Sequence, residues 1–100
     1  MIENRYDENS AHLMIKVNGR FDFNCHGLFR KAFVAKPQAK TYTVDLSGVS
    51  YLDSSALGML LLLRNYADVR GAKVFLSHCS MVVSQILKMA NFNRLFTISE

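Results

Sequence analysis

The strongest constraint on the fold is a strand that runs into a long apolar helix near the middle of the chain. Residues 41–46 (TYTVDL) are rich in β-branched and aromatic side chains and predict a strand. From Ala56 the chain continues with leucine, glycine, methionine and four leucines, which predicts a helix that Gly71 ends. Because a strand followed by a helix is the repeating unit of α/β proteins, we expect an α/β fold.

The segments on either side extend this pattern. Residues 12–18 alternate well enough for a strand, which we expect to pair with a strand at 2–6 across a turn at 7–10. Together these segments predict a mixed sheet whose central strands are covered by helices on at least one face.

Two further helices are predicted from apolar stripes at helical spacing. The first stripe, between residues 24 and 35, consists of Leu28, Phe29, Ala32 and Phe33. The second follows a capping serine, Ser80, and consists of Val82, Val83, Ile86, Leu87 and Ala90. We expect each stripe to face the core.

Length and composition indicate one domain over residues 1–100. Half of the residues are hydrophobic and proline occurs once, which argues against disorder. The longest apolar run, Met59–Leu63, is far too short to cross a bilayer, and the first residues lack a signal-peptide pattern. We therefore expect a cytoplasmic protein with no membrane association.

Three polar residues, Asp53, Ser54 and Ser55, stand at the junction between the central strand and its helix. Each is a good N-cap residue, and a helix start needs one cap. No Glu or Gln lies three residues after any of them, so there is no capping box and at least one hydroxyl is left over. Helix starts also carry partial positive charge and suit an anion such as a phosphate.

Residues 45–58 (DLSGVSYLDSSALG) resemble the phosphorylation segment of the STAS-domain anti-sigma factor antagonists. In that family the serine directly after the aspartate is phosphorylated, so the resemblance implies that Ser54 is the phosphosite and leaves Ser55 as the alternative. One departure is Ala56, where the family has glycine. Alanine is the better helix former, and its methyl group alters the surface expected to meet a kinase.

The resemblance extends over most of the chain. Residues 19–22 match a turn before the family's first helix, in which Asp22 corresponds to the turn aspartate. Residues 71–76 resemble the family's next strand, and residues 80–96 resemble its third helix and the segment after it. The family's relatives usually continue with a further helix, which we expect this domain to lack. The fold implied is a single STAS-like domain with helices mainly on one face of its sheet.

The resemblance also implies a function in bacterial partner switching. The unphosphorylated form is expected to bind an anti-sigma factor with serine-kinase activity, and phosphorylation of Ser54 to end that binding. A phosphatase of the PP2C type would restore it. The kinase and partner interface is expected to include the following residues: Asp22, Asp53, Ser55, Ala56, Gly58 and Met59.

Asp22 and Asp53 admit two interpretations. They could form an acidic lip around the serine that a kinase or its nucleotide-bound metal recognises, or they could be turn and cap residues only. The apolar helix that begins near Ala56 also admits two interpretations. Met59 and Leu63 share one ridge, which could face the sheet or could form a groove for a partner.

Other functional classes find less support. Cys25 lies beside His26, and Cys79 beside His78, but neither pair has metal-ligand spacing, so no metal or cofactor is expected. An enzyme using Ser54 would need a general base, and the only histidines are these two and His12. We therefore do not expect an enzyme.

The net charge of +4 leaves a nucleic-acid partner open as an alternative. Basic residues concentrate around the first predicted helix: Arg20, Arg30, Lys31, Lys36 and Lys40. No RRM, KH, zinc-finger or helix-turn-helix pattern accompanies them, so an acidic protein partner is preferred. A constitutive scaffold subunit of a signalling complex is the remaining alternative.

Overall fold

Strands and helices alternate along the chain after an initial hairpin, as the sequence pattern predicts. The computed structural model describes residues 2–100. The elements are β1 (Ile2–Asp7), β2 (His12–Phe21), the 3-10 helix η1 (Phe23–Cys25), α1 (His26–Val34), β3 (Thr41–Leu52), α2 (Ser54–Val69), β4 (Lys73–Ser77), α3 (Met81–Met89), the 3-10 helix η2 (Phe92–Arg94) and β5 (Thr97–Ile98).

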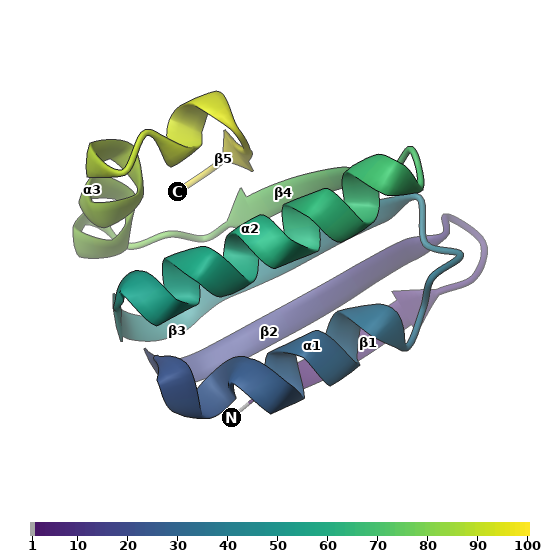
Figure 1. Cartoon of the computed structure of the whole chain (residues 1–100), viewed down its shortest axis with the longest axis horizontal. Coiled ribbons are helices and arrows are strands. Elements are labelled where there is room, and N and C mark those ends of the chain that lie inside the picture. The colour runs from purple at the N-terminus through teal and green to yellow at the C-terminus, as the bar shows by residue number, and fades with distance from the viewer. Residues whose placement is uncertain (1) are drawn as a thin grey trace.

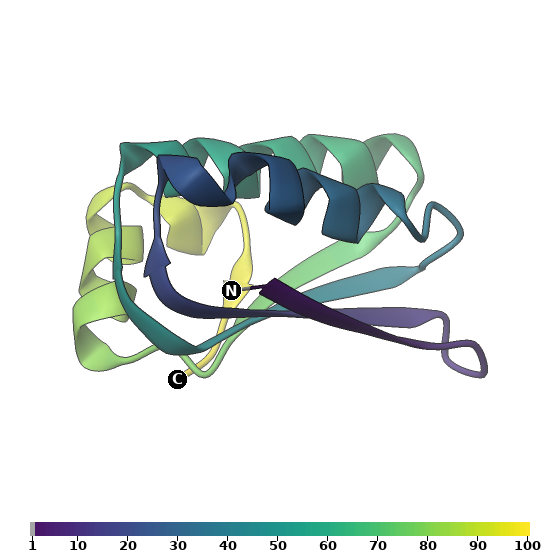
Figure 2. The same cartoon turned by 90° about the horizontal axis from the view of Figure 1, so that it is seen from below.

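The strands form one mixed sheet in the order β1-β2-β3-β4-β5. β1 is antiparallel to β2, and every other neighbouring pair is parallel. Figure 1 shows α1 and α2 side by side across the sheet, with α3 and η2 beyond the β4 side. Figure 2 shows that α1 and α2 cover the same face and leave the other face open. The expected mixed sheet with helices mainly on one face is confirmed.

The core lies between the sheet and the two helices. Leu13, Ile15 and Val17 of β2 alternate toward this layer and are fully buried. Aromatic rings line α1 and continue to α2, with Phe29, Phe33 and Tyr66 in successive ring contacts. The apolar helix α2 therefore packs on the sheet, as its more conservative interpretation predicts.

Two details differ from the sequence predictions, and a third agrees with them. Gly19 and the two residues after it belong to β2 and not to a turn. The backbone at Gly19 has a φ of +84°, and the β2–β3 register shifts on either side of it. Leu28 and Val82 fall on the predicted apolar stripes but are exposed, because each helix turns only the inner part of its stripe toward the sheet. Ser80 does cap α3, accepting a hydrogen bond from the Val83 N–H at 3.2 Å.

This packing predicts different costs for two neighbouring leucines of α2. Leu63 is fully buried, whereas Leu62 is 46% exposed. Leu63→Ala should lower the free energy of unfolding by about 2–5 kcal/mol through lost burial and a residual cavity. Leu62→Ala should change it by less than about 1 kcal/mol. Urea unfolding followed by circular dichroism measures both, and equal costs would contradict the placement of α2.

Candidate functional site

The candidate site is built where β2 and β3 end side by side. Phe21, the last residue of β2, is paired with Leu52, the last residue of β3. The backbone N–H of Asp53 donates to the Phe21 carbonyl oxygen at 3.4 Å, which extends the pairing by one step. Asp22 and Asp53 therefore follow paired strand ends and lie at the same end of the sheet, as predicted.

Both aspartates act as caps. Asp53 is the N-cap of α2, and its Oδ1 accepts a hydrogen bond from the Ala56 N–H at 2.9 Å. Asp22 caps η1, and its Oδ1 accepts from the Asn24 N–H at 3.0 Å. Its other oxygen lies 3.6 Å from the Arg20 Nε. These bonds match the turn and cap interpretation of the two carboxylates.

Because Asp53 is the N-cap of α2, neither Ser54 nor Ser55 caps this helix. Ser54 is the first residue of α2 and is exposed, whereas Ser55 is half-buried. Among residues 2–100, the Ser54 hydroxyl has no hydrogen-bond partner. It stands at the positive end of a 16-residue helix, where an added anion is favoured. Ser54 is therefore the more accessible of the two candidate acceptors.

The other predicted interface residues divide by burial. Ala56 is fully buried and Met59 is 2% exposed, so their side chains belong to the core. Their assignment to a partner-contacting surface is corrected, because both lie on the sheet side of α2. Gly58 is exposed, and a Cβ built there meets no atom within 4 Å, so this part of the helix surface is open.

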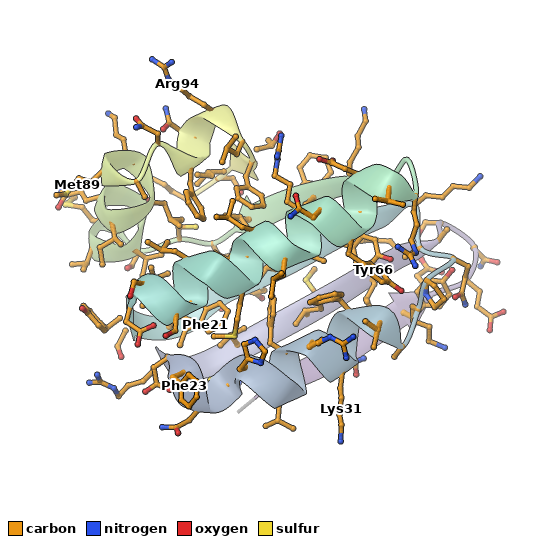
Figure 3. The ribbon with its side chains drawn as sticks, in the orientation of Figure 1. Phe21, Phe23, Lys31, Tyr66, Met89 and Arg94 are labelled. Carbon is orange, nitrogen blue, oxygen red and sulfur yellow. The ribbon has the colours of Figure 1, made fainter. Side chains whose placement is uncertain are left out.

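Exposed aromatic side chains complete the surface at this end. Phe23, in η1, is 71% exposed, and Tyr51, near the end of β3, is 45% exposed. The Arg20 guanidinium lies over the Tyr51 ring, 5.6 Å from its centroid. Figure 3 shows Phe23 at the end of the molecule where α2 begins.

We call Arg20, Phe23 and Tyr51 together with Ser54 the strand-end surface, because they lie where β2 and β3 end. Sequence reasoning missed its two aromatic residues. The available signal was that Phe23 lies outside the apolar stripe of the following helix.

The cysteines and histidines do not form a metal cluster. Within residues 2–100, no three His, Cys, Asp or Glu side chains gather closely enough to hold an ion. Cys25 and Cys79 are buried free thiols. Burial, with smaller contributions from Glu100 and Asp45, raises the pKa of the Cys79 thiol to about 11, so it remains protonated at neutral pH.

The histidine and aspartate of the open sheet face lie away from Ser54. His12 begins β2, at the other end of that ten-residue strand, and its Nε2 lies 2.7 Å from the Thr43 Oγ1. Burial alone would raise the pKa of Asp45, but hydrogen bonds from Ser47 and the nearby His78 outweigh it and leave that pKa lowered. Neither group is placed to activate the Ser54 hydroxyl.

Comparison with known proteins assigns the chain. Residues 4–98 match the family described as "Mlab, STAS domain". The chain belongs to the STAS-domain family. The STAS-domain containing protein PA14_20770 of Pseudomonas aeruginosa (strain UCBPP-PA14) is 49% identical over 92 residues, which cover 91% of each chain.

Solved structures agree on the fold. A putative anti-sigma factor antagonist from Thermotoga maritima superposes with a TM-score of 0.86 at 18% identity, over 99% of this chain and 86% of that one. The anti-sigma factor antagonist SpoIIAA in its unphosphorylated form gives 0.76 at 14% identity, over 100% and 87%. SpoIIAA of Bacillus in its phosphorylated form gives 0.69 at 13% identity, over 100% and 92%. The STAS fold is confirmed.

One further finding concerns membranes. Among the described residues, no helix combines the length and the apolar character that a membrane crossing requires.

The capping arrangement predicts unequal effects of two neighbouring substitutions. Asp53→Ala removes the side chain that satisfies the Ala56 N–H and should lower the free energy of unfolding by about 0.5–2 kcal/mol. Ser54→Ala removes a hydroxyl without a partner and should change it by less than about 0.5 kcal/mol. Denaturant unfolding of both variants checks this, and a larger cost for Ser54→Ala would identify Ser54 as the cap.

Proposed function

We propose that this STAS domain is a phosphorylation-controlled protein-interaction switch of the anti-sigma factor antagonist type. The unphosphorylated form binds an anti-sigma factor with serine-kinase activity, or an equivalent regulator, and phosphorylation of Ser54 releases it. A PP2C-type phosphatase resets the switch. The observation that carries the proposal is the exposed Ser54 hydroxyl at the start of α2, which is left without a partner because Asp53 is the cap.

The magnitudes favour a local switch. A phosphate adds about −1.5 to −2 charges, and at an exposed helix start it gains only about 0.3–1 kcal/mol, which is too little to refold a domain. An unpaired anion buried in an interface costs on the order of 2–5 kcal/mol, or about thirty-fold to a few thousand-fold in affinity. Asp22 and Asp53 already lie at this end, so the phosphate increases a negative charge that is present before modification.

The structural relatives support this assignment. The fold resembles SpoIIAA in both the unphosphorylated and the phosphorylated form, so one fold of this type accommodates both states. That agrees with a switch that changes a surface and leaves the domain intact. The constitutive scaffold differs in one respect, since a scaffold would keep its partner after Ser54 is modified.

The exposed aromatic residues suggest how a partner is held. Phe23 and Tyr51 offer apolar area at the end of the molecule where α2 begins with Ser54, and Arg20 adds a positive charge over the Tyr51 ring. Aromatic and arginine side chains are the residues that most often dominate binding energy at protein interfaces. An anchor beside Ser54 would place the phosphate inside the contact area, where its desolvation is most costly.

The phosphosite assignment is tested by mapping. We expect phosphopeptide analysis of the protein recovered from its native cell to place the phosphate on Ser54. Ser54→Ala should abolish modification, whereas Ser55→Ala should retain it, because Ser55 is half-buried. Phosphate on Ser55 in the unaltered protein would refute the assignment.

The local-switch mechanism predicts that folding and binding separate in a charge mimetic. Ser54→Asp should remain within about 1 kcal/mol of the parent in stability. Its affinity for the cognate regulator should fall at least about tenfold, or 1.4 kcal/mol. Asn65→Asp is the matched control, since it adds the same charge to an exposed position about three turns along α2. Unfolding and partner titration measure both quantities.

The carboxylate of Ser54→Asp carries less charge than a phosphate. Partner binding by stoichiometrically phosphorylated protein therefore decides whether Ser54 is the switch. Parental affinity in that form would remove Ser54 as the switch. It would favour the constitutive scaffold.

The aromatic anchor gives a second binding prediction. Phe23→Ala should weaken partner binding by about thirty-fold, the effect of losing 2 kcal/mol at a hot spot, with little change in stability. Val69→Ala is the control, because Val69 is 83% exposed but lies at the far end of α2. Equal effects of the two substitutions on affinity would exclude Phe23 as an anchor.

A further inference from the structure

The two edges of the sheet are unequally protected. The edge formed by β5 is only two residues long, whereas β1 presents six residues at the other edge. β1 pairs with β2 in an unbroken register from Ile2 to Asp7, and contains neither proline nor a bulge. A long, regular edge strand exposes unpaired backbone N–H and C=O groups, which are a template for pairing with another strand.

The side chains of β1 alternate between the two faces of the sheet. Ile2 and Tyr6 pack against the core on the helix side, and the Asn4 Nδ2 donates to the Ala32 carbonyl of α1 at 3.4 Å. Glu3 and Arg5 point to the open face and are exposed. The ion pairs present within residues 2–100 include neither of them.

We infer that β1 pairs with β1 of a second copy of this chain, antiparallel about a twofold axis at Asn4. In this register Glu3 lies opposite Arg5 of the second copy, and Arg5 opposite its Glu3, on the open face. Ile2 and Tyr6 oppose each other in the same reciprocal way on the helix face. Directly opposite residues of antiparallel strands are close enough to interact, so two ion pairs and two apolar pairs form.

Other registers match less well. Because side chains alternate between faces, the register can shift only in steps that keep the faces aligned. Moving the axis to Arg5 opposes two arginines and places Glu3 opposite Asp7, and moving it to Glu3 opposes two glutamates. An axis at Tyr6 opposes Arg5 to Asp7, but it pairs fewer residues of each strand. The sequence of β1 is therefore complementary to itself in one main register.

The position of α1 adds to the interface. α1 packs near β1, and Figure 3 shows Lys31 pointing outward on the β1 side of that helix. Leu28 lies one turn earlier on the same side and is 56% exposed. A twofold axis normal to the sheet brings the two α1 helices next to each other on one face, which covers Leu28. Leu28, which was predicted to face the core but is exposed, thus has an apolar environment in the dimer.

The test is the mass of the protein in solution. A six-residue edge with one flanking helix is a small interface, so we expect a dissociation constant of about 1 µM to 1 mM. Sedimentation equilibrium over about that concentration range should show the mass rising from 11.3 kDa toward twice that value. A single monomeric species at the highest concentration would overturn the inference.

Charge exchange tests the register. Glu3→Arg and Arg5→Glu should each give a monomer, because each places like charges opposite one another. An equimolar mixture of the two variants should form a heterodimer, since two arginines of one chain then face two glutamates of the other. The double variant with both substitutions should form a homodimer again. Asp7→Asn is the control and should dimerise like the parent.

Some outcomes would refute the register. A dimer that persists in both single variants, or a mixture that stays monomeric while the parent dimerises, contradicts pairing about Asn4. Circular dichroism establishes that each variant is folded. Should Arg5→Glu unfold, Glu3→Arg and the double variant still decide the question. Because the test needs no partner or phosphate, it stands independently of the proposed function.

Discussion

The parallel pairing of β2 with β3 is the constraint on which the rest of the structure depends. It joins the hairpin to the strand–helix unit and supplies the central strands whose alternate residues form the core. It also ends with Phe21 opposite Leu52, so the chain leaves both strands at the same place. Backbone geometry alone therefore brings Asp22 close to Asp53, although 31 residues separate them. Both the candidate site and the core follow from one register.

Where β2 and β3 end, two polar side chains stabilise the local backbone and a third does not. Asp53 satisfies the helix start and Asp22 satisfies η1, so the two carboxylates hold the local backbone. Ser54 does not cap the helix and lies at the positive end of α2. A group that stabilises nothing can be modified at little cost to the fold, because the free energy of unfolding does not depend on it. This is the physical basis for the proposed switch at the surface.

The two proposals place function on different parts of the molecule. The strand-end surface, which carries the proposed switch, lies where β2 and β3 end, whereas the inferred dimer uses the outer edge of β1. Pairing through β1 would leave Ser54 of both copies exposed. Two linked binding surfaces raise the local concentration of the second one, so a dimer could bind a dimeric regulator more tightly than a single domain does.

The sequence by itself determined the order of the first three strands and the three α-helices, the apolar helix after the central strand, and the Asp53-Ser54-Ser55 junction. These features depend on local periodicity, propensity and capping chemistry, which are properties of short segments. Ser80 as a cap and Gly71 as a helix end were predictable for the same reason.

Only the tertiary structure decided which of the three junction residues is the cap, and which predicted site residues reach the surface. Ala56 and Met59 lie within one turn or so of Ser54 but are buried, because the angle at which α2 meets the sheet selects the exposed side of the helix. Leu28 is exposed for a similar reason, since α1 meets the sheet over a narrower stripe than hydropathy suggests. The free edge of β1 is likewise a property of strand order, which is set by contacts between distant segments and not by any one of them.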